Sequence, residues 1–115
     1  MMMGNVFRIT GFLSVALLGT AFGAEAQNIE KGATVYAAQK CSMCHALDGK
    51  GNAKGALDGV GSKLKADEIR QWIVTPAEMT AKSEATRKPA MKAYPNLPKE
   101  DLDALVAFLA SKKKA

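Results

Sequence analysis

Two cysteines and a histidine carry the most specific chemical pattern in the sequence. Cys41 and Cys44 are three positions apart, and His45 directly follows the second cysteine. On one turn of helix, residues i and i+3 lie on the same face, so both thiols can reach the two vinyl groups along one edge of a porphyrin and form thioethers. His45 can then offer an imidazole nitrogen to the iron as the proximal axial ligand. The spacing predicts one covalently attached haem c with its iron.

Two other interpretations of this motif are weaker. A redox-active or disulfide-forming Cys-x-x-Cys pair is typical of a βαβ context, and the chain has no strand pattern that could supply one. A closed zinc site needs four protein ligands, whereas the sequence contains two cysteines and one histidine. Haem attachment is therefore the interpretation that the motif favours.

The opposite axial position of the iron needs a ligand from elsewhere in the chain. His45 is the only histidine, so the candidates are methionine sulfurs. Met43 lies inside the attachment turn and cannot reach the far face of the ring, whereas Met91 lies in a proline-bounded segment far enough along the chain to wrap it. We favour Met91 as the distal iron ligand and keep Met79, just after a predicted helix end, as the lesser candidate. A thioether ligand favours ferrous iron and raises the reduction potential.

Helical spacing before the motif predicts the element that positions it. Asn28 can cap a helix that runs to residue 40, with small and apolar residues recurring at helical spacing. Gly32 and Tyr36 lie four residues apart on one face of this helix, which suits close crossing by another helix. After His45, glycines recur through residues 46–62. Their density predicts a loop, and their spacing matches neither a P-loop nor a dinucleotide fingerprint.

Apolar residues after the motif indicate which faces turn toward the porphyrin. The apolar side chains that we expect to touch the ring from the glycine-rich segment are Leu57, Val60 and Leu64. A helix over residues 67–74, stopped by Pro76, turns an apolar face inward, and that face consists of Ile69, Trp72 and Ile73. The indole N–H of Trp72 needs an acceptor if it is buried, and a haem propionate is a candidate.

The last third of the chain predicts two more helices. A short helix over residues 77–86 is followed by an extended segment at residues 88–91. Pro98 is expected in the first turn of the last helix, where its missing N–H costs nothing. The apolar face of that helix consists of Leu102, Leu105, Val106, Phe108 and Leu109. With no repeat and no strand pattern, the sequence predicts an all-α fold.

The first residues have the features of a targeting segment. A positively charged start precedes an apolar run at residues 12–22 that is too short to span a bilayer. Ala24-Glu25-Ala26 supplies the small-x-small pattern that signal peptidase reads. We expect residues 1–26 to be a signal peptide cleaved before Gln27, which leaves residues 27–115 as one haem-binding domain with no membrane attachment. An uncleaved membrane anchor is the alternative.

The charge of the chain bears on its partners. The sequence carries 16 Lys and Arg against 11 Asp and Glu, a net charge of +5, with 6% aromatic residues. Dispersed basic residues and few aromatics argue against nucleic acid binding. The charge either has no specific role or forms a lysine-rich face that steers transient docking onto acidic redox partner proteins. The lysines that would form such a face are Lys40, Lys50, Lys54, Lys88 and Lys92.

Together these motifs resemble those of the class I c-type cytochromes, the small monohaem electron carriers of the bacterial periplasm and of mitochondria. The resemblance covers residues 28–113, and its clearest parts are the CSMCH turn, the GALDGVG loop at residues 55–61 and Met91 with the following KAYPNL. It implies the cytochrome c fold, in which about three to five short helices wrap around one covalently bound haem. It also implies that Gly32 and Tyr36 lie where the first and last helices cross, and that Met91 is the distal ligand.

The chain departs from the family pattern at one position near the haem. The family usually has proline after the glycine that corresponds to Gly55, and the carbonyl of that proline accepts a hydrogen bond from the proximal histidine. Here the position is Ala56. We therefore expect the carbonyl of Ala56 to accept the bond but to be less rigidly aimed.

The resemblance implies a function as well as a fold. We expect a periplasmic one-electron carrier that cycles its haem iron between Fe(III) and Fe(II) and is not itself an enzyme. One alternative is a haem-bearing electron-transfer subunit of a larger oxidoreductase. Another is a haem peroxidase or gas-binding protein with an open iron site, which requires that no methionine coordinates the iron.

Overall fold

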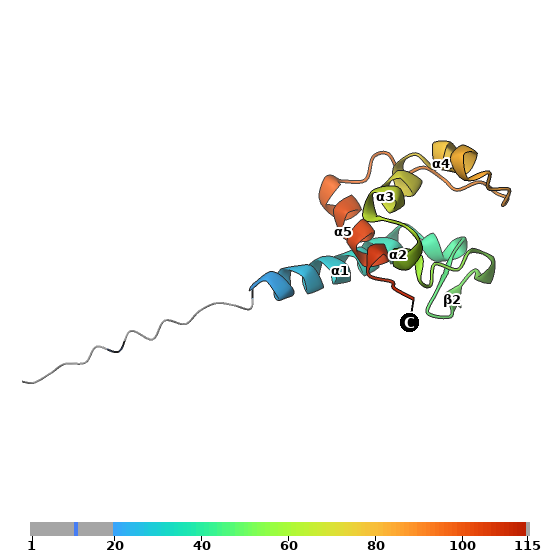
Figure 1. Cartoon of the computed structure of the whole chain (residues 1–115). Helices are drawn as coiled ribbons and strands as arrows, with labels where there is room; N and C mark the ends of the chain where they lie inside the picture. Colours follow the sequence, from blue (N-terminus) through green and yellow to red (C-terminus); the bar gives the residue numbers. More distant parts are fainter. Residues whose placement is uncertain (1–10, 12–19, 115) are drawn as a thin grey trace, which may run out of the picture.

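The computed structural model describes residue 11 and residues 20–114. Figure 1 shows the helices, which are α1 (Thr20–Ala38), α2 (Val60–Lys63), α3 (Ala66–Val74), α4 (Pro76–Ser83) and α5 (Lys99–Ala110). Two 3-10 turns, η1 (Cys41–Met43) and η2 (Ala53–Gly55), flank a hairpin made of β1 (Ala46–Leu47) and β2 (Lys50–Gly51). The predicted all-α fold is confirmed, and the hairpin is the exception, because strands of two residues are too short to show an alternating pattern.

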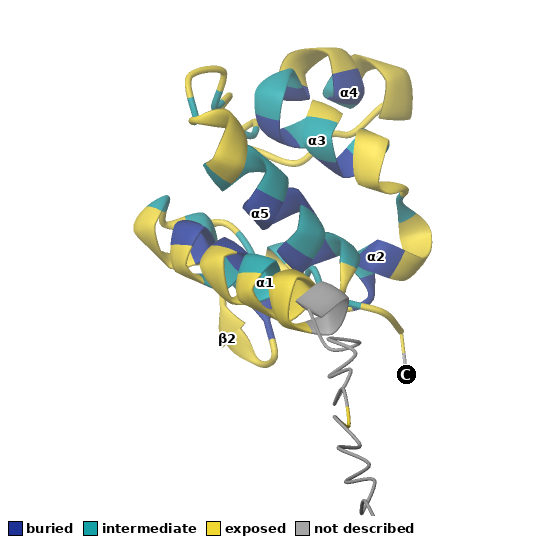
Figure 2. Ribbon diagram, turned by 90° about the vertical axis from the view of Figure 1, so that its left-hand side faces the viewer, coloured by how far each residue is buried: buried dark blue, intermediate teal, exposed yellow. Residues whose placement is uncertain are grey.

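The α1–α5 crossing forms the centre of the core. A Cβ atom at position 32 would overlap the carbonyl of Ala104 and the Cβ of Phe108, so only glycine allows the two helices to approach this closely. The rings of Tyr36 and Phe108 pack edge to face with their centroids 5.7 Å apart, an arrangement that aromatic pairs prefer. Figure 2 shows the buried residues of α5 in the middle of the molecule, between α1 and α3. The structure thus places Gly32 and Tyr36 at the expected crossing.

α3 covers the other side of α5. Ile69 and Ile73 of α3 are each 3% exposed and belong to the same apolar core as Leu105 of α5. At the edge of this contact, the guanidinium of Arg70 donates a hydrogen bond to the carboxylate of Asp103 at 2.7 Å. α3 ends at Val74, as the sequence predicts. Pro76 does more than stop it, because α4 begins at Pro76 rather than at residue 77.

Several predicted helix boundaries differ from the structure, and the first helix ends at Ala38 rather than at residue 40. α1 begins by Thr20, so Asn28 lies inside the helix and does not cap it, because residues 24–30 contain no helix breaker. α4 ends at Ser83 rather than at residue 86, since Glu84 adopts the left-handed conformation with φ of 56°. Pro98 directly precedes α5 instead of occupying its first turn.

The predicted signal peptide extends beyond the part of the chain that the structure describes. Residues 1–10 and 12–19 lie outside it, so the leader and its cleavage before Gln27 stay predictions. Residues 20–26 belong to α1, whose first turns extend away from the other helices in Figure 1. Among the described residues, no helix is both long enough and apolar enough to span a bilayer.

Candidate functional site

A cavity of about 320 Å³ lies beside the attachment turn and is lined mainly by apolar side chains. Cys41, Cys44 and His45 line it from the segment after α1, and Met91 lines it from the segment before α5. The structure therefore brings all four predicted haem-binding residues to one cavity, although Met91 is far from the others in the sequence. Two thiols, an imidazole and a thioether are a donor set that fits a covalently held haem.

The attachment turn is held by its own backbone. Lys40, two residues after the end of α1, adopts the left-handed conformation with φ of 57°. The chain then forms η1, in which the N–H groups of Cys44 and His45 both donate to the carbonyl of Cys41, at 3.2 and 3.0 Å. Both cysteines are free thiols, and Cys44 is exposed. Burial raises the pKa of the Cys41 thiol.

His45 is oriented by a hydrogen bond from its ring. Its Nδ1 lies 2.8 Å from the carbonyl oxygen of Gly55. A carbonyl can only accept, so Nδ1 carries the proton and Nε2 keeps a free lone pair for a metal. Burial lowers the pKa of His45, the bond to Gly55 opposes this shift, and the nearby charge of Arg87 adds to it. The site therefore favours the neutral imidazole, which is the form that ligates iron.

The prediction for the carbonyl that orients His45 was wrong by one residue. The acceptor is Gly55, not Ala56. Gly55 ends the η2 turn, whereas Ala56 forms a bridge with Ala46, next to His45. The neighbouring N–H of Leu57 donates to the Ala46 carbonyl at 2.8 Å. Pairing with the hairpin thus fixes the backbone at position 56 and leaves the preceding carbonyl to face the imidazole.

The two candidate methionines occupy different environments. Met91 is partly buried and lines the cavity. Met79 is 9% exposed on α4, and it is absent from the described residues that line the cavity. Its side chain packs within the protein, which is the ordinary role of a methionine in a core.

The predicted apolar contacts of the ring also reach the cavity. Its lining includes Leu57, Val60, Leu64 and Trp72, as expected, and also Tyr36, Tyr94, Leu105 and Leu109. The hydroxyl of Tyr36 is buried and has no hydrogen-bond partner among the described residues, and burial raises its pKa. The hydroxyl of Tyr94 donates to the carbonyl of Gln39 at 3.4 Å.

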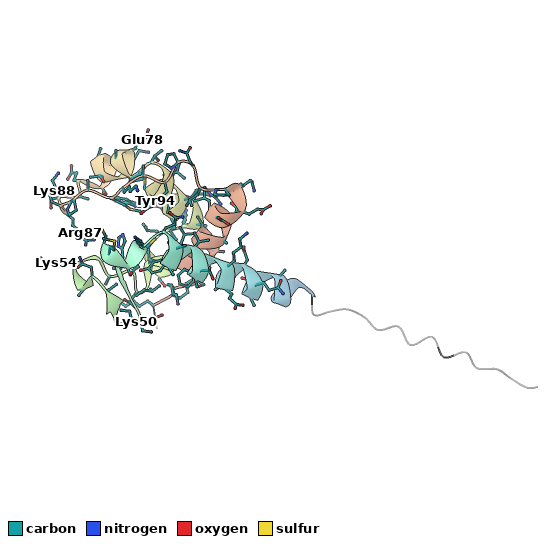
Figure 3. The ribbon with its side chains drawn as sticks, turned by 180° about the vertical axis from the view of Figure 1, so that it is seen from behind. Lys50, Lys54, Glu78, Arg87, Lys88 and Tyr94 are labelled. Carbon is teal, nitrogen blue, oxygen red and sulfur yellow. The ribbon has the colours of Figure 1, made fainter. Side chains whose placement is uncertain are left out.

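The sequence interpretation missed one charged residue of the site. Arg87 lines the cavity and donates from Nη2 to the carbonyl of Cys44 at 2.6 Å. Its one signal in the sequence is its position four residues before Met91 in a segment whose other cations are lysines. Figure 3 shows Arg87 at one end of the molecule with Lys88 and Lys54 near it, while Lys50 lies farther away. The other two lysines considered for docking are Lys40 and Lys92, and both line the cavity.

The fold and the donor set define a small all-α domain built to hold a haem. Residues 29–113 match the family model described as Cytochrome c, so the chain belongs to the cytochrome c family. This family binds covalently attached haem c with its iron and serves haem-based electron transfer. The predicted cofactor and the resemblance to c-type cytochromes are thereby confirmed.

One curated relative is a much longer protein. The chain is 29% identical over 92 residues to "Cytochrome c oxidase subunit 2" of Alkalihalophilus pseudofirmus, an alignment that covers 72% of this chain. The chain matches only 25% of that relative's length. No solved structure matched the chain.

Proposed function

We propose that this protein is a periplasmic one-electron carrier that cycles haem iron between Fe(III) and Fe(II) as it moves between respiratory or other redox enzymes. The observation that carries the proposal is that Cys41, Cys44, His45 and Met91 line the same cavity. Cys41 and Cys44 would hold the ring through thioethers, and His45 and Met91 would ligate the iron. The haem supplies the redox chemistry, so the protein need not act as an enzyme.

The residues of the site serve to hold the iron in one environment. The Nδ1 bond to Gly55 fixes the orientation of the His45 ring, which such outer hydrogen bonds commonly do for metal-bound imidazoles. Met91 offers an uncharged sulfur, which favours the ferrous state. With His45 and Met91 both bound to it, the iron would need little rearrangement during electron transfer. Trp72 lines the cavity and is our candidate donor to a haem propionate.

Transient docking of redox partners is proposed through the lysine-rich face. Lys40 and Lys92 lie at the cavity, and Lys54 and Lys88 are exposed near one end of the molecule in Figure 3. Lysines arranged in this way would raise the association rate with acidic partners and make it sensitive to salt. Lys50 is exposed but lies farther from Arg87 in the same view, so we expect it to contribute least.

A potentiometric titration of the purified haem protein tests the proposal. We expect a single reversible step of one electron, and a lower reduction potential in Met91→Ala because the sulfur ligand is lost. The ferrous wild type should not bind carbon monoxide, whereas ferrous Met91→Ala should. Rapid carbon monoxide binding by the wild type would contradict the proposal and favour the open-site alternative.

The similarity to an oxidase subunit favours a second candidate function. Because the relative is named as a subunit of cytochrome c oxidase and this chain matches a quarter of its length, the domain could instead serve as a fixed electron-transfer part of a larger oxidoreductase. Gel filtration of the native protein separates the two. A carrier elutes as a small protein whose mature sequence begins at Gln27 in mass spectrometry, whereas a subunit co-purifies with its complex from the membrane fraction.

A further inference from the structure

One side chain joins the segment that carries Met91 to the turn that carries the cysteines. Nη2 of Arg87 donates to the carbonyl of Cys44 at 2.6 Å across 43 positions of sequence. Cys44 directly precedes His45, and Arg87 precedes Met91 by four residues. The hydrogen bond therefore links the two parts of the chain that supply opposite axial ligands in the proposed function.

Arg87 also packs against the residue that orients His45. A Cβ atom at position 55 would overlap both the guanidinium of Arg87 and the carbonyl of Cys44, so the guanidinium lies directly on the Cα of Gly55. The carbonyl of the same Gly55 accepts the bond from Nδ1 of His45. Cys44, His45, Gly55 and Arg87 thus form one contiguous group, and only Arg87 in it comes from the Met91 segment.

The Met91 segment has few other fixed points. Residues 81–90 are all exposed, and no regular element lies between Ser83 and Lys99. The N–H of Ala85 donates to Thr80 at 3.1 Å, and that of Tyr94 donates to Ile73 at 2.9 Å. Between these two bonds, residues 86–93 make no hydrogen bond to the described chain except the one from Arg87. A charged donor to a carbonyl is stronger than a neutral one, so this contact is a main restraint on the segment.

We propose that Arg87 is a positioning residue that keeps the Met91 segment closed against the attachment turn and so keeps the sulfur of Met91 on the iron. This inference rests on the proposed function, because it takes Met91 as the distal ligand. Arg87 does not touch the iron. It acts by holding the backbone that presents the ligand, and its loss should favour local opening of the segment without unfolding the α1–α5 core.

Urea titration of the ferric haem protein tests this role with two signals from one sample. Loss of the near-red charge-transfer band reports release of the methionine sulfur, and loss of the helical circular dichroism signal reports global unfolding. In Arg87→Gln, we expect the band to disappear at a clearly lower urea concentration than the helical signal, with a wider gap than in the wild type. If Arg87 only stabilised the whole fold, its loss would lower the urea midpoints of the band and of the helical signal together, because the sulfur would then be released only when the protein unfolds.

Binding of imidazole to the ferric iron provides a second readout, because it requires Met91 to leave. We expect binding to be about tenfold faster in Arg87→Gln, which converts to about 1.4 kcal/mol. Lys82→Gln is the matched control, since it removes one positive charge from an exposed residue of α4 and should leave the rate unchanged. Arg87→Lys keeps a charged donor and should recover part of the difference.

The outcomes separate this inference from the proposed function. If the wild type has the near-red band and Arg87→Gln matches Lys82→Gln in both the urea gap and the imidazole rate, the positioning role of Arg87 is wrong while the carrier function stands. If the wild type lacks the band, the proposed Met91 ligation itself fails. A wider gap and faster binding confined to the Arg87 variants would support the inference.

Discussion

The α1–α5 crossing and the Met91 segment both line the site, but they are held in place by different physical means. At the crossing, Ala104 is 0% and Leu105 2% exposed, and the helices meet without space for a single side-chain carbon at Gly32. Along the Met91 segment, residues 81–90 are exposed. Two side-chain hydrogen bonds tie the segment to the chain at and just before the attachment turn, from Arg87 to Cys44 and from Tyr94 to Gln39. Close packing thus fixes the crossing, while a few polar contacts place the segment.

This difference implies two levels of stability in one small protein. Buried apolar contacts open only with the whole core, whereas an exposed segment with few hydrogen bonds can open by itself. In the proposed function this division would be useful, because the core would keep the haem enclosed while the Met91 segment would set how firmly the sulfur is held. Changes in the two regions should therefore have effects of different size and kind.

The largest effect is expected from Gly32→Val. The added side chain would overlap the Ala104 carbonyl and the Phe108 Cβ, so the helices must separate, at a cost of about 3 kcal/mol. Urea unfolding followed by circular dichroism measures the loss. Ala37→Val is the control, because Ala37 is exposed on the same helix and the change should cost less than about 0.7 kcal/mol. Equal losses in both variants would show that the crossing is not tightly packed.

A smaller effect of opposite sign is expected from Ala56→Pro, which places the family's usual residue beside the attachment turn. Ala56 has φ of −57°, a value that proline adopts, so the variant should be more stable by about 0.4–1 kcal/mol. Because His45 bonds to Gly55 and not to Ala56, the reduction potential should stay unchanged. A shifted potential would indicate that the carbonyl at position 56 orients the imidazole.

The smallest effect is expected from Asp103→Asn, at the rim of the core. Hydrogen bonds from Lys99 and Arg70 lower the pKa of Asp103 below its ordinary value of 3.8. The folded protein therefore binds this proton more weakly than the unfolded chain does. The stabilisation by the Asp103 carboxylate is complete above the ordinary pKa, and it is lost as the pH falls through the lower pKa of the folded protein. At pH 7 (well above both pKa values) the variant should melt lower by about 3 °C or less.

Thermal unfolding at several pH values checks the Asp103 prediction. The difference from the wild type should shrink under strongly acidic conditions, where the carboxyl is protonated in both states. Glu30→Gln, which removes a carboxylate at an exposed position of α1, is the control and should melt as the wild type does at pH 7. A difference that persists unchanged in acid would mean that the carboxylate charge is not what stabilises the protein.

The same contrast explains which features the sequence could predict. Features that follow from spacing within one element were predicted, and the structure has them as expected. They are the haem motif, the pair Gly32 and Tyr36, and the apolar faces of α3 and α5. The Gly55 carbonyl and the Arg87–Cys44 bond depend on where distant backbone atoms meet, which no local spacing encodes. The predicted cap at Asn28 failed because a good local signal is overridden when helix-forming residues continue on both sides.

The most direct measurement of the central claim is the near-red charge-transfer band of the ferric protein, compared among the wild type, Met91→Ala and Met79→Ala. If the iron lies between His45 and Met91, the band is present in the wild type and in Met79→Ala and absent in Met91→Ala. A band that survives in Met91→Ala and disappears in Met79→Ala, or one missing from the wild type, would contradict the account.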